Sequence, residues 1–290
     1  MLTFPAYNSS PASDPCSYNF ERCKLCGAET AHPTYLLKKT TVYACPVCDF
    51  HYINYLDDLP PVVPDEILQP IDHKSRNYIE ACLPANELQH RINLQLVKCQ
   101  TPLSGKQCLD IGAGAGLFAH LLAETGAVVQ GIEPQVIFRA FAREKFGIEL
   151  RGETVDARCW QQSFRAFFDL VTLWDVFEHV NFPAELLQQA ANLIKPGGLL
   201  VLDTPRRDAL YYRISEWSYR LSRGANPLFL ETLYSPLPFR HKQIFTLSQL
   251  LQLVERSGFS VLAINSSVLR MHNKMVLVCR KEEQRPESAG

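Results

Sequence analysis

The sequence predicts an α/β fold with a doubly wound, mostly parallel sheet, preceded by a small metal-binding module. Three observations lead to this prediction. From Gln107 onward, short apolar segments alternate with amphipathic ones, which is the pattern of a parallel sheet covered by helices. A glycine-rich loop at 112–116 directly follows the first apolar segment. Near the amino terminus, two Cys-x-x-Cys pairs are separated by eighteen residues.

The composition is that of an ordinary soluble globular chain. Its 290 residues suffice for one large domain and one small one. The net charge of −1 provides no global basic field that would favour nucleic acid. The first 20 residues lack the pattern of a signal peptide, and no stretch is apolar enough to span a membrane. We therefore expect a cytoplasmic protein without a membrane partner.

The cysteine pairs predict a structural zinc site. The Cys-x2-Cys-x18-Cys-x2-Cys spacing lies in the range of such sites, and four thiolates leave no open coordination position for catalysis. The alternative is a set of free or redox-active thiols. Cys16 and His51 are spare candidate ligands that lack pairwise spacing. The predicted ligands are Cys23, Cys26, Cys45 and Cys48.

Residues 20–55 are expected to form a zinc-ribbon-like module around this metal. Gly27 follows the first pair and Asp49 the second, at positions where the backbone of a tight knuckle would take a positive φ. Residues 34–45 ("TYLLKKTTVYAC") have the β-branched and aromatic character of a short hairpin. So short a segment buries too little core to fold alone, and metal binding would stabilise it.

Composition divides the rest of the chain into further segments. We expect residues 1–19 and 284–290 to be flexible, and the proline-rich segment 56–70 to be a linker. Residues 71–99 have helical periodicity, and Pro84 predicts a break into two shorter helices. Their apolar stripe would consist of Ile79, Leu83, Leu88, Ile92 and Leu96.

The alternating region predicts its elements one by one. Five strands of the sheet are expected at 107–111, 127–133, 148–152, 167–174 and 199–203. Helices are expected at 116–126, 135–147 and 183–198, the last one closed by Lys195, Pro196 and two glycines. A helix at 245–259 and two consecutive strands at 260–266 and 274–280 then predict an antiparallel hairpin at the sheet edge.

The glycine loop is not a standard dinucleotide fingerprint. Gly112 and Gly114 match the first two glycines of G-x-G-x-x-G/A, but Leu117 occupies the last position and Gly116 comes one residue early. No Gly-Lys-Ser/Thr follows, so a phosphate-binding loop is not indicated either. The loop nevertheless lies where open α/β sheets bind ligands, beyond the carboxyl end of a strand.

Two carboxylates near this loop suggest the kind of ligand. Asp110 precedes the glycines, where it would repel a pyrophosphate but attract a cation such as the ammonium group of an amino acid. Glu133 ends the second strand, where a carboxylate can accept hydrogen bonds from both hydroxyls of a ribose.

Five motifs occur in a fixed order: "LDIGAGAG" (109–116), "GIEP" (131–134), "FDLVTLWDVFEHV" (168–180), "LIKPGGLLVLDTP" (193–205) and "HKQIFTLSQLLQLVERSGF" (241–259). With them, the chain resembles class I S-adenosylmethionine (SAM)-dependent methyltransferases, most of all the group that includes ubiquinone-biosynthesis O-methyltransferases. The resemblance covers about 107–280. It implies a Rossmann-like seven-stranded sheet with an antiparallel last strand, in a methyltransferase domain spanning 71–283.

The resemblance also implies roles for individual residues. Glu133 would hold the ribose of SAM, Asp175 would line the methionine and sulfonium region, and Asp156 is a poorly matching candidate for the adenine. The methionine part would be surrounded by Asp110, Gly112, Gly114 and Gly116. Similar cysteine clips occur in some sugar C-methyltransferases and ribosomal RNA methyltransferases, so the zinc module does not identify the substrate.

Two histidines are candidate general bases for a methyl acceptor, because their pKa lies near neutrality. His179 follows the strand at 167–174, and His241 precedes the helix at 245–259. The alternative for each is a structural or cofactor-pocket hydrogen bond.

The segment 204–245 is longer than an ordinary connection and rich in aromatic residues and arginine. We expect one helix near 208–222 and then an irregular lid that overhangs the cofactor cleft. The lid would form the pocket of an aromatic or anionic small-molecule acceptor. The alternative is an amphipathic packing element or the interface of a homodimer.

The leading hypothesis is therefore a SAM-dependent methyltransferase for a small molecule in secondary-metabolite, cofactor or sugar biosynthesis, with oxygen favoured as the acceptor. One alternative is an RNA or protein methyltransferase whose zinc module docks the macromolecule, which the near-zero net charge disfavours for RNA. The other is a non-catalytic SAM-binding protein, which the intact Asp110, glycine loop and Glu133 disfavour.

Overall fold

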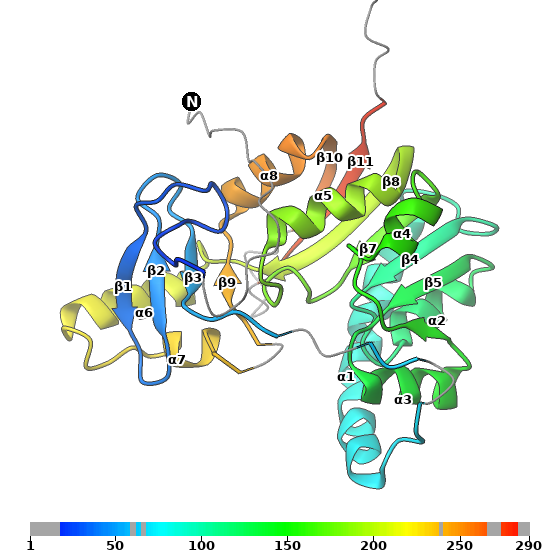
Figure 1. Ribbon diagram of the computed structural model, residues 1–290, viewed down its shortest axis with the longest axis horizontal. Helices are drawn as coiled ribbons and strands as arrows, with labels where there is room; N and C mark the ends of the chain where they lie inside the picture. Colours follow the sequence, from blue (N-terminus) through cyan, green and yellow to red (C-terminus); the bar gives the residue numbers. More distant parts are fainter. Residues whose placement is uncertain (1–17, 59–61, 65–67, 238–239, 266–273, 284–290) are drawn as a thin grey trace, which may run out of the picture.

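The computed structural model describes residues 18–58, 62–64, 68–237, 240–265 and 274–283. The predicted flexible ends lie almost entirely outside these residues, as do Cys16 and parts of the predicted linker. The described chain forms a seven-stranded sheet with helices on both faces and a smaller four-stranded sheet beside it (Figure 1). No helix in the described part of the chain is both long and apolar enough to cross a membrane.

The large sheet has the strand order β10-β11-β8-β7-β4-β5-β6. Neighbouring strands from β6 to β8 run parallel, whereas β11 lies antiparallel between β8 and β10. This arrangement confirms the predicted α/β fold with an antiparallel last strand. The strands are β4 (Gln107–Ile111), β5 (Val128–Ile132), β6 (Leu150–Arg151), β7 (Phe168–Leu173), β8 (Ile194–Pro205), β10 (Phe259–Asn265) and β11 (Lys274–Lys281).

Helices cover both faces of this sheet because its strands are apolar on both sides. Adjacent residues of β4 point to opposite faces, so Leu109 and Cys108 belong to different core clusters. On the Leu109 face pack α4 (Arg158–Ser163), α5 (Pro183–Leu193) and α8 (Leu247–Arg256). On the Cys108 face pack α1 (His73–Lys98) and α2 (Leu117–Ala123), and α3 (Val136–Phe146) lies beside α2.

The expected break at Pro84 is wrong, because α1 is one continuous helix from His73 to Lys98. Pro84 is exposed, so water can hydrogen-bond the carbonyl that its missing N–H leaves without a partner. The expected apolar stripe is only partly correct. Leu88 and Ile92 are exposed, and the buried positions of α1 are Ile79, Asn93, Leu94 and Val97.

The helix expected at 183–198 ends earlier, at Leu193, and β8 begins at the next residue. Ile194 pairs with Phe168 of β7, which draws the chain directly into the sheet. Pro196 disfavours a helical conformation at Lys195, and this local restriction explains why the helix stops before the glycines.

The small sheet is antiparallel, with the order β1-β2-β3-β9. Its first two strands, β1 (His32–Leu36) and β2 (Thr41–Ala44), form the predicted hairpin, and β3 (His51–Ile53) follows the second cysteine pair. The fourth strand, β9 (Gln243–Ile244), comes from the far end of the 204–245 segment and lies between the two parts of the molecule (Figure 1). Gly27 and Asp49 have the expected positive φ, at 75° and 56°.

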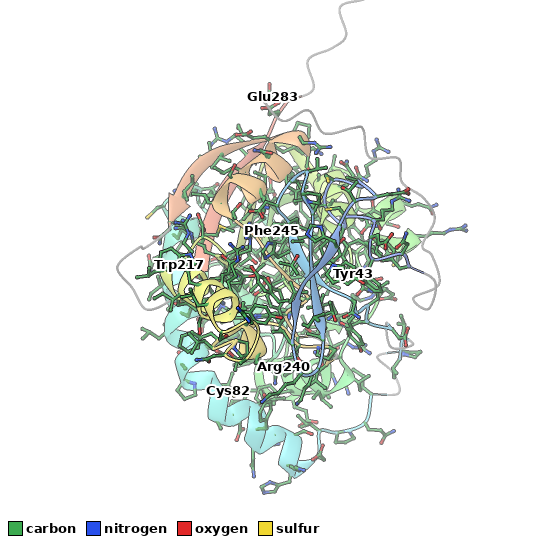
Figure 2. All side chains as sticks on the ribbon, turned by 90° about the vertical axis from the view of Figure 1, so that its left-hand side faces the viewer. Tyr43, Cys82, Trp217, Arg240, Phe245 and Glu283 are labelled. Atoms are coloured by element: carbon green, nitrogen blue, oxygen red, sulfur yellow. The ribbon has the colours of Figure 1, made fainter. Side chains whose placement is uncertain are left out.

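The described residues of 204–245 pack against this small sheet, and none of them lines the cavity at the glycine loop, so they do not form the lid that the sequence predicts. The predicted helix is present as α6 (Leu210–Leu221), followed by the short α7 (Leu230–Leu233). Trp217 lies on the outer side of α6 and is 67% exposed (Figure 2). The physical reason is that the small sheet lacks sufficient core of its own. The small sheet and the segment share one core cluster, which consists of Tyr35, Val42, Ile53, Tyr212, Leu230, Tyr234 and Ile244.

Candidate active site

A cavity of about 810 Å³ opens at the carboxyl ends of β4, β5 and β7, where open α/β sheets bind ligands. The loops after these three strands form one side, and α1 forms the other. The cavity brings together most of the site residues predicted from the sequence: Asp110, Gly112, Gly114, Glu133, Asp156, Asp175 and His179. Gly116 and His241 do not line it.

The glycines allow the loop after β4 to turn tightly under this cavity. Gly112 has φ of 71°, and a Cβ atom there would lie 2.5 Å from Cγ2 of Val176. Gly116 has φ of 78°, and a Cβ atom would lie 2.6 Å from Cβ of Ala142. Gly116 therefore lets α2 pack closely against α3. Gly112 lets the glycine loop pack closely against Val176 in the loop after β7.

Asp110 lies at the bottom of the cavity and is almost fully buried. Its Oδ1 accepts a hydrogen bond of 2.7 Å from the hydroxyl of Thr172 on β7. Burial raises the pKa of Asp110 to about 7, and the Thr172 hydroxyl partly opposes that shift. A cation placed beside Asp110 would stabilise its charged form, as expected for a site that receives an ammonium group.

Glu133 follows β5 and is held by two backbone donors. Its Oε2 accepts from the N–H of Gly114 at 2.9 Å, and its Oε1 accepts from the N–H of Gln135 at 2.8 Å. Burial raises the pKa of Glu133 to about 7, although both backbone hydrogen bonds lower it. Its carboxylate therefore lines the cavity in a fixed orientation, from which it can accept hydrogen bonds from a ligand.

Asp175 begins the loop after β7 with an unusual backbone, at φ of 55°. Its N–H donates to Oδ1 of Asp203 at 2.6 Å, and its carboxylate forms an ion pair with Lys274 of β11. Burial alone would raise the pKa of Asp175, but the charge of Lys274 lowers it below its ordinary value. Asp175 is therefore ionised and fixed at the mouth of the cavity.

His179 and His241 lie side by side, with their ring centroids 4.9 Å apart. The Nε2 atom of each lies 3.9 Å from Oε1 of Glu178, which is fully buried. Burial and the neighbouring His241 lower the pKa of His179 to about 4, and burial also lowers the pKa of His241. Burial raises the pKa of Glu178 well above its ordinary value.

The arrangement of His179, His241 and Glu178 permits two kinds of chemistry, proton transfer and metal binding. At neutral pH both imidazoles are uncharged, so each has a lone pair that can accept a proton. Their ligand atoms and a carboxylate oxygen of Glu178 also lie within 4.8 Å of one another, a donor set that divalent metals accept. Of the three residues, only His179 lines the cavity.

Sequence reasoning missed two further side chains in this cavity. Trp174 follows β7, and His90 projects from α1. The indole Nε1 of Trp174 and Nδ1 of His90 are buried without a hydrogen-bond partner among the described residues. Burial lowers the pKa of His90 to about 4. The position of Trp174 at a strand end was a usable signal, whereas nothing in the sequence marks His90.

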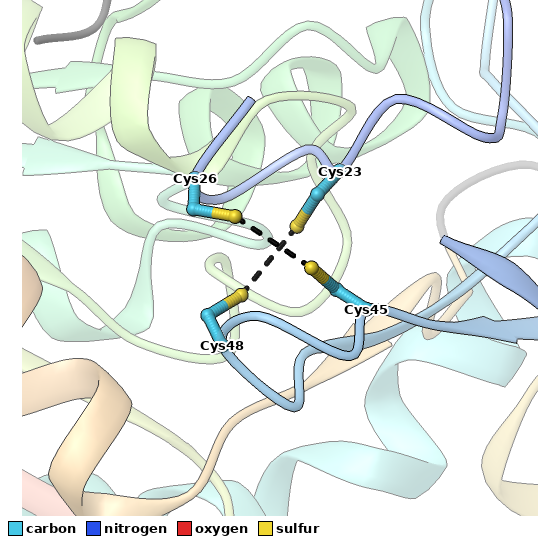
Figure 3. Close-up of side chains that lie close together, drawn as sticks. All are labelled: Cys23, Cys26, Cys45 and Cys48. Atoms are coloured by element: carbon cyan, nitrogen blue, oxygen red, sulfur yellow. Dashed lines mark hydrogen bonds between the residues drawn. The ribbon is translucent and has the colours of Figure 1, made fainter. Parts of the chain in front are cut away.

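The four predicted metal ligands also meet in space, with their side chains directed at a common centre (Figure 3). The Sγ atoms of Cys23 and Cys48 are 3.6 Å apart, as are those of Cys26 and Cys45. A tetrahedral zinc with bonds of about 2.3 Å would separate its sulfur ligands by about 3.8 Å. The thiols therefore have the spacing that tetrahedral zinc requires. His51 is not part of this set: its Nδ1 lies 3.1 Å from the hydroxyl of Tyr212, and its Nε2 lies 3.3 Å from Nη1 of Arg207.

Comparison with known proteins identifies the family. The model of the methyltransferase domain family matches residues 85–264, well over half of the chain. This chain belongs to that family. The match includes the glycine loop, Glu133 and the β7 loop, so the cavity is that of the methyltransferase domain. The resemblance that the five motifs indicate is thereby confirmed.

Curated relatives of the methyltransferase domain point to the same group. The chain is 35% identical over 132 residues to a ubiquinone biosynthesis O-methyltransferase of Thiobacillus denitrificans, covering 43% of this chain and 57% of that one. It is 31% identical over 163 residues to the protein of the same name in Aeromonas salmonicida, covering 55% and 65%. The chain thus spans less than two thirds of the length of these relatives. The cysteine module lies outside the residues that the family model matches.

A solved structure supports the fold of the methyltransferase domain. The magnesium protoporphyrin IX methyltransferase of Synechocystis PCC 6803, crystallised with bound SAH, aligns with a TM-score of 0.53 at 15% identity. The alignment covers 68% of this chain and 84% of that one.

Proposed function

We propose that this protein transfers a methyl group from SAM to a hydroxyl oxygen of a small aromatic molecule. The observation that carries the proposal is the convergence of Asp110, Glu133 and His179 on one cavity. The first two suit the charged and ribose parts of SAM, and the third is a neutral imidazole beside them. The cavity volume of about 810 Å³ falls within the usual range for ligand sites.

The residues of the cavity fit SAM as the donor. The buried Asp110 gains a counter-charge when the ammonium group of the methionine part binds near it. Glu133 presents carboxylate oxygens to the ribose hydroxyls. Because Gly112 has no side chain, the loop can turn tightly beside Val176. The bound cofactor supplies the electrophilic methyl group, so the remaining task of the protein is to orient the acceptor and remove its proton.

The acceptor half of the cavity favours an uncharged ring over an anion. Among the described residues, neither lysine nor arginine lines the cavity, so an anionic group would have no cation to pair with there. The cavity also has an apolar and aromatic lining, with Tyr78 and Leu83 on α1, Phe118 on α2 and Trp174 directly after β7. The unpartnered nitrogens of Trp174 and His90 would bind oxygen substituents of such a ring.

His179 is the residue that accepts the proton of the acceptor hydroxyl. Its imidazole is neutral at physiological pH because burial lowers its pKa to about 4. The imidazole of His241 and the buried carboxyl of Glu178 lie beside its ring. Oxygen as the target is also supported by the curated relatives, which are named O-methyltransferases.

The four cysteines bind one structural zinc ion. Their sulfur spacing supports this assignment, and all four side chains are buried, so the metal would have no position open to a substrate.

A labelled-methyl experiment tests the function. The full chain is incubated with methyl-labelled SAM and fractions of cell extract, and labelled products are identified by mass. Label in a small aromatic product, unchanged by nuclease or protease pretreatment, supports the proposal. Label that disappears after nuclease or protease treatment would instead identify a macromolecular acceptor. Failure to bind SAM by calorimetry would overturn the proposal altogether.

A further inference from the structure

The cysteine module is joined to the loop that carries His179 by a short series of direct contacts. β3 follows the second cysteine pair, and the N–H of Cys45 donates to the carbonyl of Phe50 at 3.0 Å. β3 in turn pairs with β9, where the N–H of Ile53 donates to the carbonyl of Lys242 at 2.8 Å. The metal-binding knuckle therefore fixes the strand against which β9 is hydrogen-bonded.

The opposite side of β9 holds the loop 175–182. The N–H of Lys242 donates to the carbonyl of Glu178 at 2.8 Å. The carboxamide Nε2 of Gln243 donates to the carbonyls of Phe177 at 3.0 Å and Val180 at 2.6 Å. Gln243 is fully buried, so water cannot replace these bonds if they are lost. Three backbone carbonyls next to His179 thus accept hydrogen bonds from β9 and the residue before it.

A second contact ties the same loop to the chain that leaves the module. The side chain of Asn181 donates to the carbonyl of Asp57 at 2.9 Å and accepts from its N–H at 2.8 Å. Asp57 is also paired with Lys242 at 2.6 Å. The loop is therefore held at two points by residues that belong to, or directly follow, the small sheet.

We propose that Gln243 is a positioning residue through which the cysteine module sets the place of His179 in the cavity. This inference rests on the proposed function, because it assigns His179 a role in methyl transfer. The module is then an integral part of the acceptor site and needs no macromolecular partner to explain its presence. Gln243 itself does not line the cavity, and its carboxamide donates to backbone carbonyls of the loop and not to a residue that we assign to SAM.

The substitution Gln243→Met tests this role, because it keeps the length of the side chain and removes both donors. We expect zinc content and SAM affinity to stay within about twofold of the values for the wild-type protein. We expect kcat to fall between about 10- and 100-fold on the extract fraction that the unchanged protein methylates, since small misplacements of a reacting group have effects of this size. Amide hydrogen exchange in 175–182 would become faster.

Gln252→Met is the matched control, since it makes the same chemical change at a half-exposed position of α8, where the carboxamide donates to the hydroxyl of Ser248. It should leave kcat and exchange in 175–182 unchanged. An unchanged kcat in Gln243→Met would overturn the proposal. So would equal losses in the two variants, because these would reflect a general loosening of the fold.

Metal removal provides a second test that needs neither the variant nor the acceptor. A chelator is added to the unchanged full chain, and hydrogen exchange is followed by peptide. We expect faster exchange in 20–55 and in 175–182, with the loop 112–116 unaffected. Faster exchange confined to 20–55 would overturn the coupling. If exchange spreads to 175–182 but no methyl acceptor is found, the coupling stands and the proposed function fails.

Discussion

Glu133 at the end of β5 binds the backbone N–H of Gly114 in the loop after β4, at 2.9 Å. This contact joins the ends of two neighbouring parallel strands at the cavity. It gives Glu133 two roles, because the carboxylate that we assign to the ribose of SAM also fixes the loop beneath the methionine part. If Glu133 holds the ribose as we propose, cofactor binding and loop order are coupled through one side chain.

Replacing Glu133 with Gln should weaken SAM binding by about 10- to 100-fold. The carboxylate loses its charge, and one of its two backbone donors then faces an amide nitrogen; a hydrogen bond to a charged group contributes roughly 1.5–3 kcal/mol. Calorimetry at pH 8 measures the change. Glu124→Gln, on the exposed end of α2, is the control and should bind SAM normally. Equal affinities in the two variants would remove Glu133 from the cofactor site.

Replacing Gly112 with Ala should destabilise the protein and abolish measurable SAM binding. The new methyl group would lie 2.5 Å from Cγ2 of Val176, in a backbone conformation with φ of 71° that alanine disfavours. Gly147→Ala is the matched control, because Gly147 has φ of 66° but open space around it. The control should lose only about 1–2 kcal/mol of unfolding free energy.

The double variant Gly112→Ala, Val176→Ala separates the clash from the backbone strain. It should recover most of the stability that Gly112→Ala loses beyond the control, as measured by urea unfolding. If the double variant is no more stable than Gly112→Ala, the contact with Val176 is not the cause.

The features that the sequence predicts well are those whose signal is local. The cysteine pairs, the glycine loop with Asp110 and the alternation of strands and helices each lie within a few adjacent residues, so physical rules for short segments apply to them. Gly27 and Asp49 belong to the same class, because a knuckle of fixed geometry demands a positive φ next to each cysteine pair.

The features that it predicts poorly depend on contacts between distant parts of the chain. The aromatic residues of 204–245 are equally suited to a lid and to a buried core, and only the presence of the small sheet decides that Tyr212 and Tyr234 fill its core. β9 is two residues long and becomes a strand because β3 offers a free edge. His90 enters the cavity because α1 continues through Pro84, which local propensity disfavours.

Cys45→Ser should reduce the zinc content from about one ion per chain to nearly none and lower the midpoint of thermal unfolding. A hydroxyl binds zinc far more weakly than a thiolate, and a metal held by the four cysteines would stabilise the small sheet. Metal analysis of the purified protein measures the first effect. Cys82→Ser, at an exposed position on α1, should change neither property. Unchanged zinc in Cys45→Ser would contradict the site.

His179→Gln should lower kcat by at least about 100-fold while SAM affinity stays the same, because general-base catalysis contributes factors of this order. In the unchanged protein, the acid limb of the kcat profile should lie near pH 4, where His179 becomes protonated, and not near pH 6.5. His120→Gln, on α2, is the control. A normal kcat in His179→Gln would assign the proton transfer to another group.

The pH dependence of stability tests the environment of Asp110. Its pKa is raised from 3.8 to about 7 in the folded protein, so the unfolded chain loses this proton first as the pH rises. The folded state then binds more protons than the unfolded state, and the free energy of unfolding falls between about pH 4 and pH 7. The contribution that is lost is roughly 4 kcal/mol, from about three pKa units at about 1.4 kcal/mol each.

Asp110→Asn removes this contribution without changing the size of the side chain, and its Oδ1 can still accept from Thr172. Urea unfolding of both proteins at several pH values from 4.5 to 7.5 should therefore show the variant gaining stability relative to the unchanged protein as the pH rises. Saturating SAM should reduce the difference, because its ammonium group stabilises the ionised carboxylate of Asp110. If the stability curves of the two proteins stay parallel over this pH range, Asp110 titrates normally. If SAM does not reduce the difference between them, Asp110 does not face the cofactor.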